Sequence, residues 1–185
     1  MKRCDWQNIE TSQLYIDYHD NEWGKASFDD DYLFEMIVLE SFQCGLSWLT
    51  ILKKRNAFRI AFDEFNPNII ANYNQEKIDL LCKNADIIRN KLKIKATIEN
   101  AKSFLKIQNE FGSFRNYIWS FTNNEIVFSP YNKEITHNEL SDKVSQDLKK
   151  RGFKFMGTVV TFSYLEAIGV MNNHAEYCFK YKNQN

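Results

Sequence analysis

Apolar side chains recur at helical spacing along most of the chain, and Gly, Asn and Pro interrupt the repeats. Acidic residues at 29–31 suit the N-terminal dipole of a helix whose apolar face leads to Gly45. Ser47 can cap a second helix, which runs to Phe62 and stops before the break at Asn66-Pro67. The pattern therefore predicts two consecutive helices in the first third of the chain.

The rest of the chain continues the helical pattern, with one irregular stretch at 122–138 that holds at most a weak strand at 125–128. Ser141 can cap one helix, and Gly152 can end it. The strongly apolar stretch 157–171 is predicted to be the central buried helix. The fold is thus expected to be all-α, with further helices over 76–83, 91–110, 113–120, 141–151 and 157–171.

Composition fits this helical prediction. Aromatic residues make up 15% of the 185 residues, and the 6 Gly and 2 Pro are few, as suits a helical protein. The length fits a single globular domain, 1–185, with a sizeable core. Because 24 basic residues balance 24 acidic ones, a DNA-binding face would need local segregation of charge.

The chain shows no signal segment, and no apolar run is long enough to cross a bilayer. We therefore expect a cytoplasmic monomer without membrane contact. In a reducing compartment, its cysteines should be free thiols or metal ligands rather than disulfides.

Potential metal ligands lie at both ends of the chain: Cys4 and His19 near one, His174 and Cys178 near the other. His174 and Cys178 are spaced i, i+4, so on a helical turn their side chains would point the same way. Two sulfur and two nitrogen donors match tetrahedral zinc, and such a site would staple the termini together. The alternative is a buried thiol beside a surface histidine. The third histidine, His137, is expected at the surface.

A carboxylate and several aromatic residues suggest a second site. Glu40 falls on the apolar face of its predicted helix, where a carboxylate is costly unless it is paired or functional. It could instead bond a backbone amide or a basic residue in the core. Trp6, Trp23 and Trp48 could likewise be ordinary core residues.

Collinear motifs covering nearly the whole chain resemble the DNA-3-methyladenine glycosylase I family of the constitutive bacterial type. The most specific strings are Tyr-His-Asp-Asn-Glu-Trp-Gly at 18–24 and Lys-Lys-Arg-Gly-Phe-Lys-Phe at 149–155. Others are Leu-Phe-Glu-Met-Ile at 33–37, Gly-Leu-Ser-Trp at 45–48, Ile-Ile-Arg-Asn-Lys at 87–91, and Asn-His at 173–174 with Cys178.

The resemblance implies a helix-hairpin-helix glycosylase fold and one structural zinc on the four terminal Cys and His residues. It also implies a base pocket built from Glu40, Tyr15, Tyr18 and Trp48, with Trp6 and Trp23 near its wall. The implied activity is hydrolytic excision of 3-methyladenine from alkylated double-stranded DNA in base-excision repair.

This chemistry assigns a role to each pocket residue. The base must leave the stack to be reached, and 3-methyladenine in DNA is cationic, so aromatic faces and a carboxylate suit it. We expect Trp48 to stack on the base, Glu40 to act as the catalytic and recognition residue, and Tyr18 and Tyr15 to line the pocket. No lysine is placed as a Schiff-base former, which predicts a monofunctional enzyme.

Three basic runs could grip DNA phosphates: one after the connection 84–90, one at 149–154 and one at 53–55. The residues expected to contact DNA are Arg89, Lys91, Lys150 and Arg151. Each run could instead be a solvated helix face.

Two other functions remain open. A non-enzymatic, zinc-stabilised module could bind alkylated or distorted DNA without releasing a base. A zinc-stabilised helical interaction domain would show no preference for damaged DNA.

Overall fold

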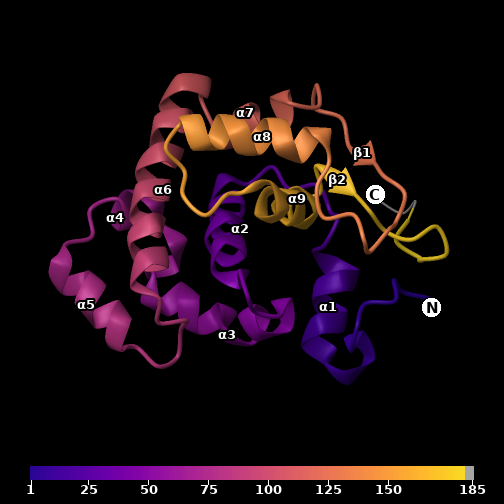
Figure 1. The fold of residues 1–185 in the computed structure, drawn as a ribbon, viewed down its shortest axis with the longest axis horizontal. Coiled ribbons are helices and arrows are strands. Elements are labelled where there is room, and N and C mark those ends of the chain that lie inside the picture. The colour runs from indigo at the N-terminus through magenta and orange to yellow at the C-terminus, as the bar shows by residue number, and fades with distance from the viewer. Residues whose placement is uncertain (182–185) are drawn as a thin grey trace.

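The computed structural model describes residues 1–181, and helices make up most of them (Figure 1). The predicted range 1–185 includes 182–185, which lie outside the described residues. The helices are α1 (Gln13–Asn21), α2 (Asp30–Gln43), α3 (Trp48–Ala61), α4 (Pro67–Ile70), α5 (Gln75–Lys83), α6 (Lys91–Phe111), α7 (Phe114–Ser120), α8 (Glu139–Lys150) and α9 (Thr158–Ala167). Two short 3₁₀ turns, Ile9–Thr11 and Asp63–Phe65, complete the helical segments. The prediction of an all-α fold is confirmed.

The central helix is α2, which contacts α3, α6, α7 and α9 (Figure 1). Every residue of α2 from Leu33 to Phe42 is buried, including two glutamates, so this helix is surrounded on all sides. The prediction that 157–171 forms the central helix is wrong. Helix α9 packs on α2 and α8 and is mostly buried, but Val159 is 50% exposed, so α9 is less enclosed than α2.

Side-chain caps fix where several helices begin. The Asp29 carboxylate accepts a hydrogen bond from the Asp31 amide, and Ser47 Oγ accepts one from the Thr50 amide. Both starts agree with the sequence prediction. In α8 the cap is Asn138 rather than Ser141, which instead completes a reciprocal capping box three residues later.

Helices α1, α4 and α9 differ from the prediction, and α4 follows directly on the predicted break at Asn66-Pro67. Helix α1 is not predicted by the pattern, because its residues are mostly polar and aromatic without a clear apolar stripe. Helix α9 ends at Ala167, and Met171 lies in strand β2 (Met171–Asn172), which pairs in parallel with β1 (Val127–Phe128). None of the described helices is both long and apolar enough to cross a bilayer.

Gly169 makes the turn between α9 and β2 possible. Its φ is +72°, and a Cβ there would collide with the backbone of Lys25 and Ala26. Ser27 donates its amide to the carbonyl of Ile168 at 3.0 Å, so two chain segments pass here at close range.

We expect Gly169→Ala to lower the free energy of unfolding by about 3 kcal/mol, because the backbone must move to admit the methyl group. Thermal unfolding measures this. Gly157→Ala is the matched control, since its Cβ would meet open space. Equal melting temperatures for the two variants would contradict this account of the turn.

Candidate active site and metal cluster

A cavity of about 150 Å³ lies where α1, α2, α3 and α9 meet. An apolar cavity of roughly this volume can hold one small aromatic ring. It is lined by Trp6, Tyr15, Tyr18, Trp23, Glu40, Gln43, Trp48, Ser163 and Glu166. The structure therefore brings together all six residues predicted for the base pocket, from segments up to 42 residues apart in the chain (Trp6 to Trp48).

Aromatic rings form most of the cavity wall. The Trp6 ring lies 4.6 Å from Trp23 in an edge-to-face arrangement and 5.1 Å from Tyr15, between ring centroids. The Tyr18 and Trp48 rings are 5.3 Å apart. Such walls present π faces to an occupant, and π faces suit a planar, positively charged ring.

Glu40 is the unpaired carboxylate of the cavity. Its side chain is buried, and Oε2 has no hydrogen-bond partner among the described residues. Burial, and then the nearby Glu166, raises the pKa of Glu40 well above its ordinary value. The indole Nε1 of Trp48 is likewise buried without an acceptor. The pocket thus holds one acceptor and one donor that a ligand could satisfy.

A core ion pair was the alternative setting expected for Glu40. The structure has such a pair at Glu35, on the same helix. Its carboxylate accepts from Arg55 Nε at 2.7 Å and from Arg59 Nη2 at 3.0 Å. No ion pair in the described part of the chain involves Glu40. Two buried glutamates five residues apart therefore have different settings, and only Glu40 faces the cavity.

The cavity contains three residues that were not predicted as site residues: Gln43, Ser163 and Glu166. Glu166 accepts a 2.6 Å hydrogen bond from Asn173 Nδ2, and burial raises its pKa to about 8. A sequence signal for Glu166 existed, since it is a carboxylate within an apolar helix, as Glu40 is.

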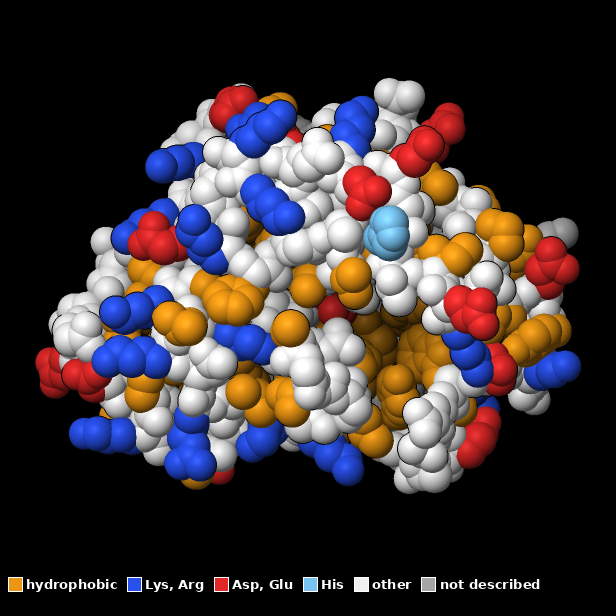
Figure 2. All heavy atoms as spheres, viewed as in Figure 1, with side chains coloured by type: hydrophobic (Ala, Val, Ile, Leu, Met, Phe, Trp, Pro, Cys, Tyr) orange, Lys and Arg blue, Asp and Glu red, His pale blue; other side chains and the backbone are white. Residues whose placement is uncertain are grey.

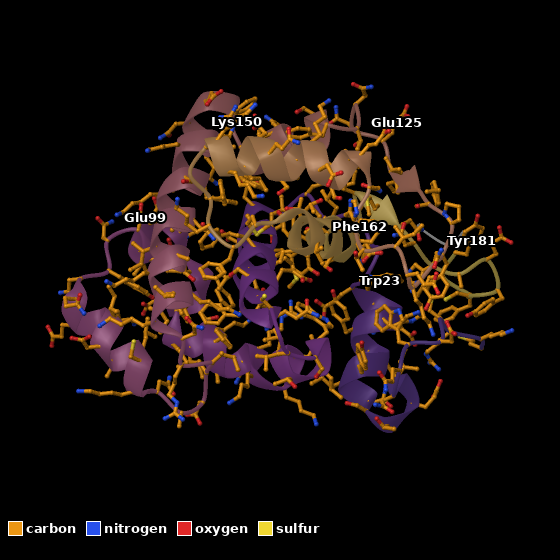
Figure 3. All side chains as sticks on the ribbon, viewed as in Figure 1. Trp23, Glu99, Glu125, Lys150, Phe162 and Tyr181 are labelled. Carbon is orange, nitrogen blue, oxygen red and sulfur yellow. The ribbon has the colours of Figure 1, made fainter. Side chains whose placement is uncertain are left out.

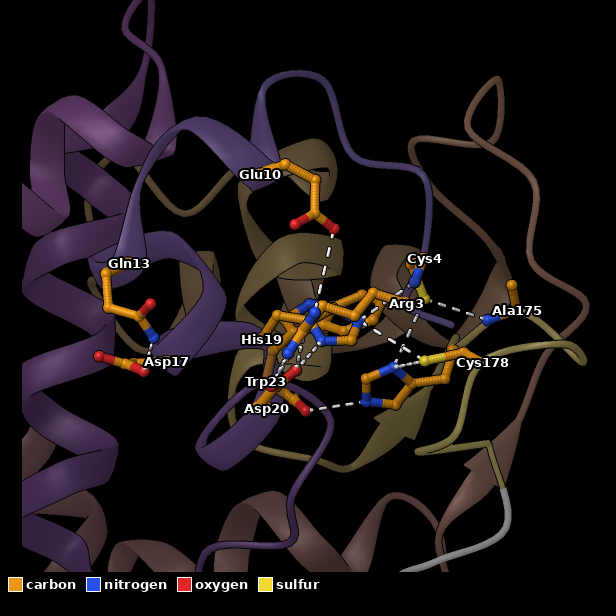
Figure 4. Close-up of polar contacts among 11 residues, drawn as sticks. Arg3, Cys4, Glu10, Gln13, Asp17, His19, Asp20, Trp23, Ala175 and Cys178 are labelled. Atoms are coloured by element: carbon orange, nitrogen blue, oxygen red, sulfur yellow. Dashed lines mark hydrogen bonds and ion pairs between the residues drawn. The ribbon is translucent and has the colours of Figure 1, made fainter. Parts of the chain in front are cut away.

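Cys4, His19, His174 and Cys178 form a buried cluster beside this cavity (Figure 4). Their candidate ligand atoms all lie within 4.8 Å of one another. The Sγ–N distances are 3.5 Å from Cys4 to His174, and 3.6 Å from Cys178 to both His19 and His174. Tetrahedral zinc with ordinary bond lengths needs S–N separations of about 3.6 Å. The donor set and spacing fit zinc.

The outer nitrogens of both imidazoles also have partners, as metal-bound histidines require. His19 Nδ1 lies 2.8 Å from Asp20 Oδ1, and Arg3 holds that carboxylate with two hydrogen bonds from Nε and one from Nη2 (Figure 4). His174 Nε2 lies 3.1 Å from the carbonyl of Trp23. Burial lowers the pKa of both histidines, which keeps the rings neutral.

His174 and Cys178 do not lie on a helical turn, and that expectation is wrong. The segment after β2 is a loop with tight turns, in which Cys178 donates its amide to the carbonyl of Ala175. The two side chains still converge. His137 is exposed, as predicted.

The cluster also supports the cavity wall. The Trp23 ring lies 4.5 Å from the His174 ring, and the Trp6 ring lies 4.9 Å from the His19 ring. Tyr18 and His19 are neighbours on α1 and face the cavity and the cluster, respectively. Order in the cluster therefore fixes the position of aromatic side chains in the cavity.

The basic runs divide into exposed and structural residues. Arg89, Lys91 and Lys150 are exposed, and Figure 2 shows Lys and Arg side chains gathered on the side of α5 and α6. Arg151 instead donates to Asp147 and Glu110. Its guanidinium is therefore ion-paired within the protein and is not free to contact a phosphate.

Three further basic residues make hydrogen bonds or ion pairs within the protein. Lys54 Nζ donates to the carbonyls of Ala85 and Asp86, which anchors the connection between α5 and α6. Lys93 is buried and donates to the carbonyls of Phe42 and Cys44 at the end of α2. Arg55 pairs with glutamates on two segments: Glu22 and Glu35. In the run at 53–55, Lys54 and Arg55 are therefore engaged within the protein, whereas Lys53 is exposed.

Comparisons with known proteins agree with this geometry. A family model described as methyladenine glycosylase matches residues 6–181. DNA-3-methyladenine glycosylase 1 of Escherichia coli (strain K12) is 42% identical over 184 residues, which is 98% of this chain and 97% of the relative. The DNA-3-methyladenine glycosylase of Haemophilus influenzae is 40% identical over 95% of this chain and 96% of its own.

Solved structures agree as well. A crystal structure of 3-methyladenine DNA glycosylase I matches with a TM-score of 0.91 at 42% identity, over 96% of this chain and 98% of that one. A single-residue variant of such an enzyme, in complex with 3-methyladenine, matches with a TM-score of 0.90 at 37% identity, over 94% and 95% of the two chains. The chain belongs to the methyladenine glycosylase family.

Proposed function

We propose that this chain excises 3-methyladenine from alkylated double-stranded DNA, as a glycosylase of base-excision repair. The observation that carries the proposal is the buried, unpaired carboxylate of Glu40 in a cavity walled by aromatic rings. The names of its relatives and the 3-methyladenine bound to a structural neighbour support the same substrate.

The cavity suits a base that has left the helix. Extruding a nucleotide costs a few kcal/mol, and stacking on Trp48 and contact with Glu40 would offset part of that cost. The Glu40 carboxylate attracts a methylated, cationic adenine electrostatically, and it attracts neutral adenine less strongly. The glycosidic bond of the cationic base is already weak, because departure of the base neutralises its charge. Catalysis then comes from stabilising the departing base and the developing sugar cation.

The proposed reaction is a hydrolysis without strand cleavage. A Schiff base would need a lysine at the reacting carbon, and none of the residues lining the cavity is a lysine. Water is therefore the proposed nucleophile, and Glu40 is the proposed catalytic residue.

Zinc is the proposed structural metal of the Cys4, His19, His174 and Cys178 cluster. The ligand types, their S–N separations and the hydrogen-bonded outer nitrogens of both histidines support zinc over magnesium or calcium, which take oxygen ligands. When bound, zinc would supply a cross-link between the two ends of the chain rather than chemistry in the cavity.

The proposed DNA grip uses α5, the connection 84–90 and α6 as a helix-hairpin-helix. Lys54 holds two carbonyls of this connection, and Asn90 caps α6 through the amides of Leu92 and Lys93. Backbone amides at a helix start attract phosphate. Arg89, Lys91 and Lys150 would add phosphate contacts, while Arg151 is not kept in this proposal because its guanidinium is ion-paired.

We expect Arg89→Ala and Lys91→Ala each to weaken binding to undamaged and damaged DNA alike. Each should also reduce the slope of log affinity against log salt by about 1, since each removes one phosphate contact. Binding titrations at several salt concentrations measure this. Arg151→Ala is the control and should lower the melting temperature while leaving the slope unchanged. A full wild-type slope in both single variants would remove these residues from the interface.

The base-release assay separates the leading functions. Methylated DNA is incubated with the protein, and released bases are separated by chromatography. We expect 3-methyladenine in the supernatant and unbroken strands. A non-enzymatic binder of damaged DNA would retain the lesion without release, and an interaction domain would show no preference for methylated DNA.

A further inference from the structure

Two walls of the cavity each carry a carboxyl group. Glu40 comes from α2 and Glu166 from α9, and both line the same 150 Å³ space. Glu166 has no ion pair among the described residues, and the only hydrogen bond given to its side chain there comes from Asn173. The proposed mechanism uses only Glu40, so Glu166 is left without a role.

Hydrogen bonds hold both the side chain and the backbone of Glu166. Asn173 Nδ2 donates to Oε1 at 2.6 Å, and the Asn173 residue is itself buried. The backbone carbonyl of Glu166 accepts the Gly24 amide at 2.9 Å, which ties α9 to the turn after α1. On the same helix, Ser163 lies one turn earlier and lines the same cavity. The Glu166 side chain is thus oriented by Asn173 and borders the space that an occupant would fill.

Glu166 also borders a larger groove of about 490 Å³ that adjoins the cavity. The two hollows share Trp6, Tyr15, Trp23, Ser163 and Glu166. Figure 2 shows a hollow lined by hydrophobic side chains on this face of the molecule. Glu166 therefore borders both hollows, so an occupant of either could contact it.

Two carboxyl groups in one small cavity oppose each other's ionisation. Burial raises the pKa of both, and Glu166 adds to the effect on Glu40. A cation between them would favour both ionised forms at once, whereas a neutral base of the same shape would not. The physical setting is thus selective for charge as well as for shape.

We propose that Glu166 is a second substrate-contacting carboxylate, which together with Glu40 selects a positively charged, N-alkylated purine over the neutral purine. This inference deepens the proposed function and rests on it for the identity of the substrate. Asn173 is then a positioning residue that orients the Glu166 carboxylate.

The test compares two small ligands that differ in charge and one methyl group: the permanently cationic 3,9-dimethyladeninium ion and neutral 9-methyladenine. Dissociation constants for both are measured with the wild type, Glu166→Gln and Glu99→Gln. Glu99 is exposed on α6, far from Trp23 in Figure 3, so its variant is the matched control for loss of one carboxylate.

We expect Glu166→Gln to reduce the preference for the cation roughly tenfold or more, which is the lower end of coupling for close charge pairs at interfaces. Binding of 9-methyladenine and the melting temperature should change little, and Glu99→Gln should match the wild type. Glu166→Asp keeps the charge and should retain part of the preference. A purely structural role would instead change the binding of both ligands together.

An unchanged cation preference in folded Glu166→Gln would overturn the inference. If that variant unfolds, Glu166→Met, which is also neutral and of similar length, gives the same comparison. The proposed function is judged separately, by release of 3-methyladenine from DNA by the wild type. Release by the wild type together with an unchanged preference in the variant would refute only the role of Glu166.

Discussion

Glu40→Gln should lower the rate of 3-methyladenine release on the order of a hundredfold or more, while the protein keeps its fold. The size of the effect is typical for loss of one preorganised electrostatic group in a buried site. The amide has nearly the shape of the carboxyl group, so the cavity keeps its walls. Single-turnover kinetics on methylated DNA measure the change, because they report the chemical step without product release.

The same substitution should leave the melting temperature unchanged or raise it. Because burial raises the pKa of Glu40 above its value in the unfolded chain, the folded state binds more protons. Stability then falls as pH rises through the interval between the two pKa values. Removing this group removes that cost at neutral pH.

Glu35→Gln is the matched control on the same helix. Glu35 is paired with Arg55 and Arg59, so its substitution leaves buried positive charge without a partner. We expect Glu35→Gln to have a lower melting temperature than the wild type. Full activity in Glu40→Gln would take Glu40 out of the mechanism, whatever its effect on stability.

Removal of the proposed zinc should have the second large effect, this time on the free energy of unfolding. The proposed zinc ion on Cys4, His19, His174 and Cys178 would close a loop of nearly the whole chain. Loop closure on this scale is worth about 5 kcal/mol in the chain-entropy model of cross-links. For a protein of this size, that corresponds to a loss of roughly 10–20 °C in melting temperature.

Cys178→Ser and treatment with a strong chelator should both produce this loss, and metal analysis should fall from about one zinc per chain to near zero. Cys44→Ser is the control, because Cys44 is an exposed free thiol outside the cluster. If Cys178→Ser and Cys44→Ser had the same melting temperature and the same metal content, the proposed zinc cross-link would be refuted.

The sequence predicted the helices well where caps and apolar repeats were strong, as at α2 and α3. It did not predict α1, whose polar and aromatic residues face the cavity and the metal cluster rather than a continuous core. It also extended α9 too far. An apolar run alone does not reveal that Gly169 turns the chain into β2.

The site was partly predictable for a similar reason. A buried carboxylate within an apolar helix signals either a core ion pair or a candidate ligand site. Glu35 has the ion pair, whereas Glu40 is unpaired and lines the cavity. Only tertiary structure separates them, since the partners of Glu35 lie on α3, 20 and 24 residues away. The same holds for Lys54 and Lys93, whose partners are distant backbone carbonyls, and for the Glu110 partner of Arg151. Its other partner, Asp147, lies one helical turn earlier, where spacing alone could place it.

The most direct test of the central claim is a crystal structure of this protein with 3-methyladenine bound. We expect the base to lie in the cavity, stacked against the Trp48 ring, with a ring or amino nitrogen within hydrogen-bond distance of Glu40 Oε2. A base bound only in the outer groove near Tyr131, with Glu40 still unpartnered, would contradict it.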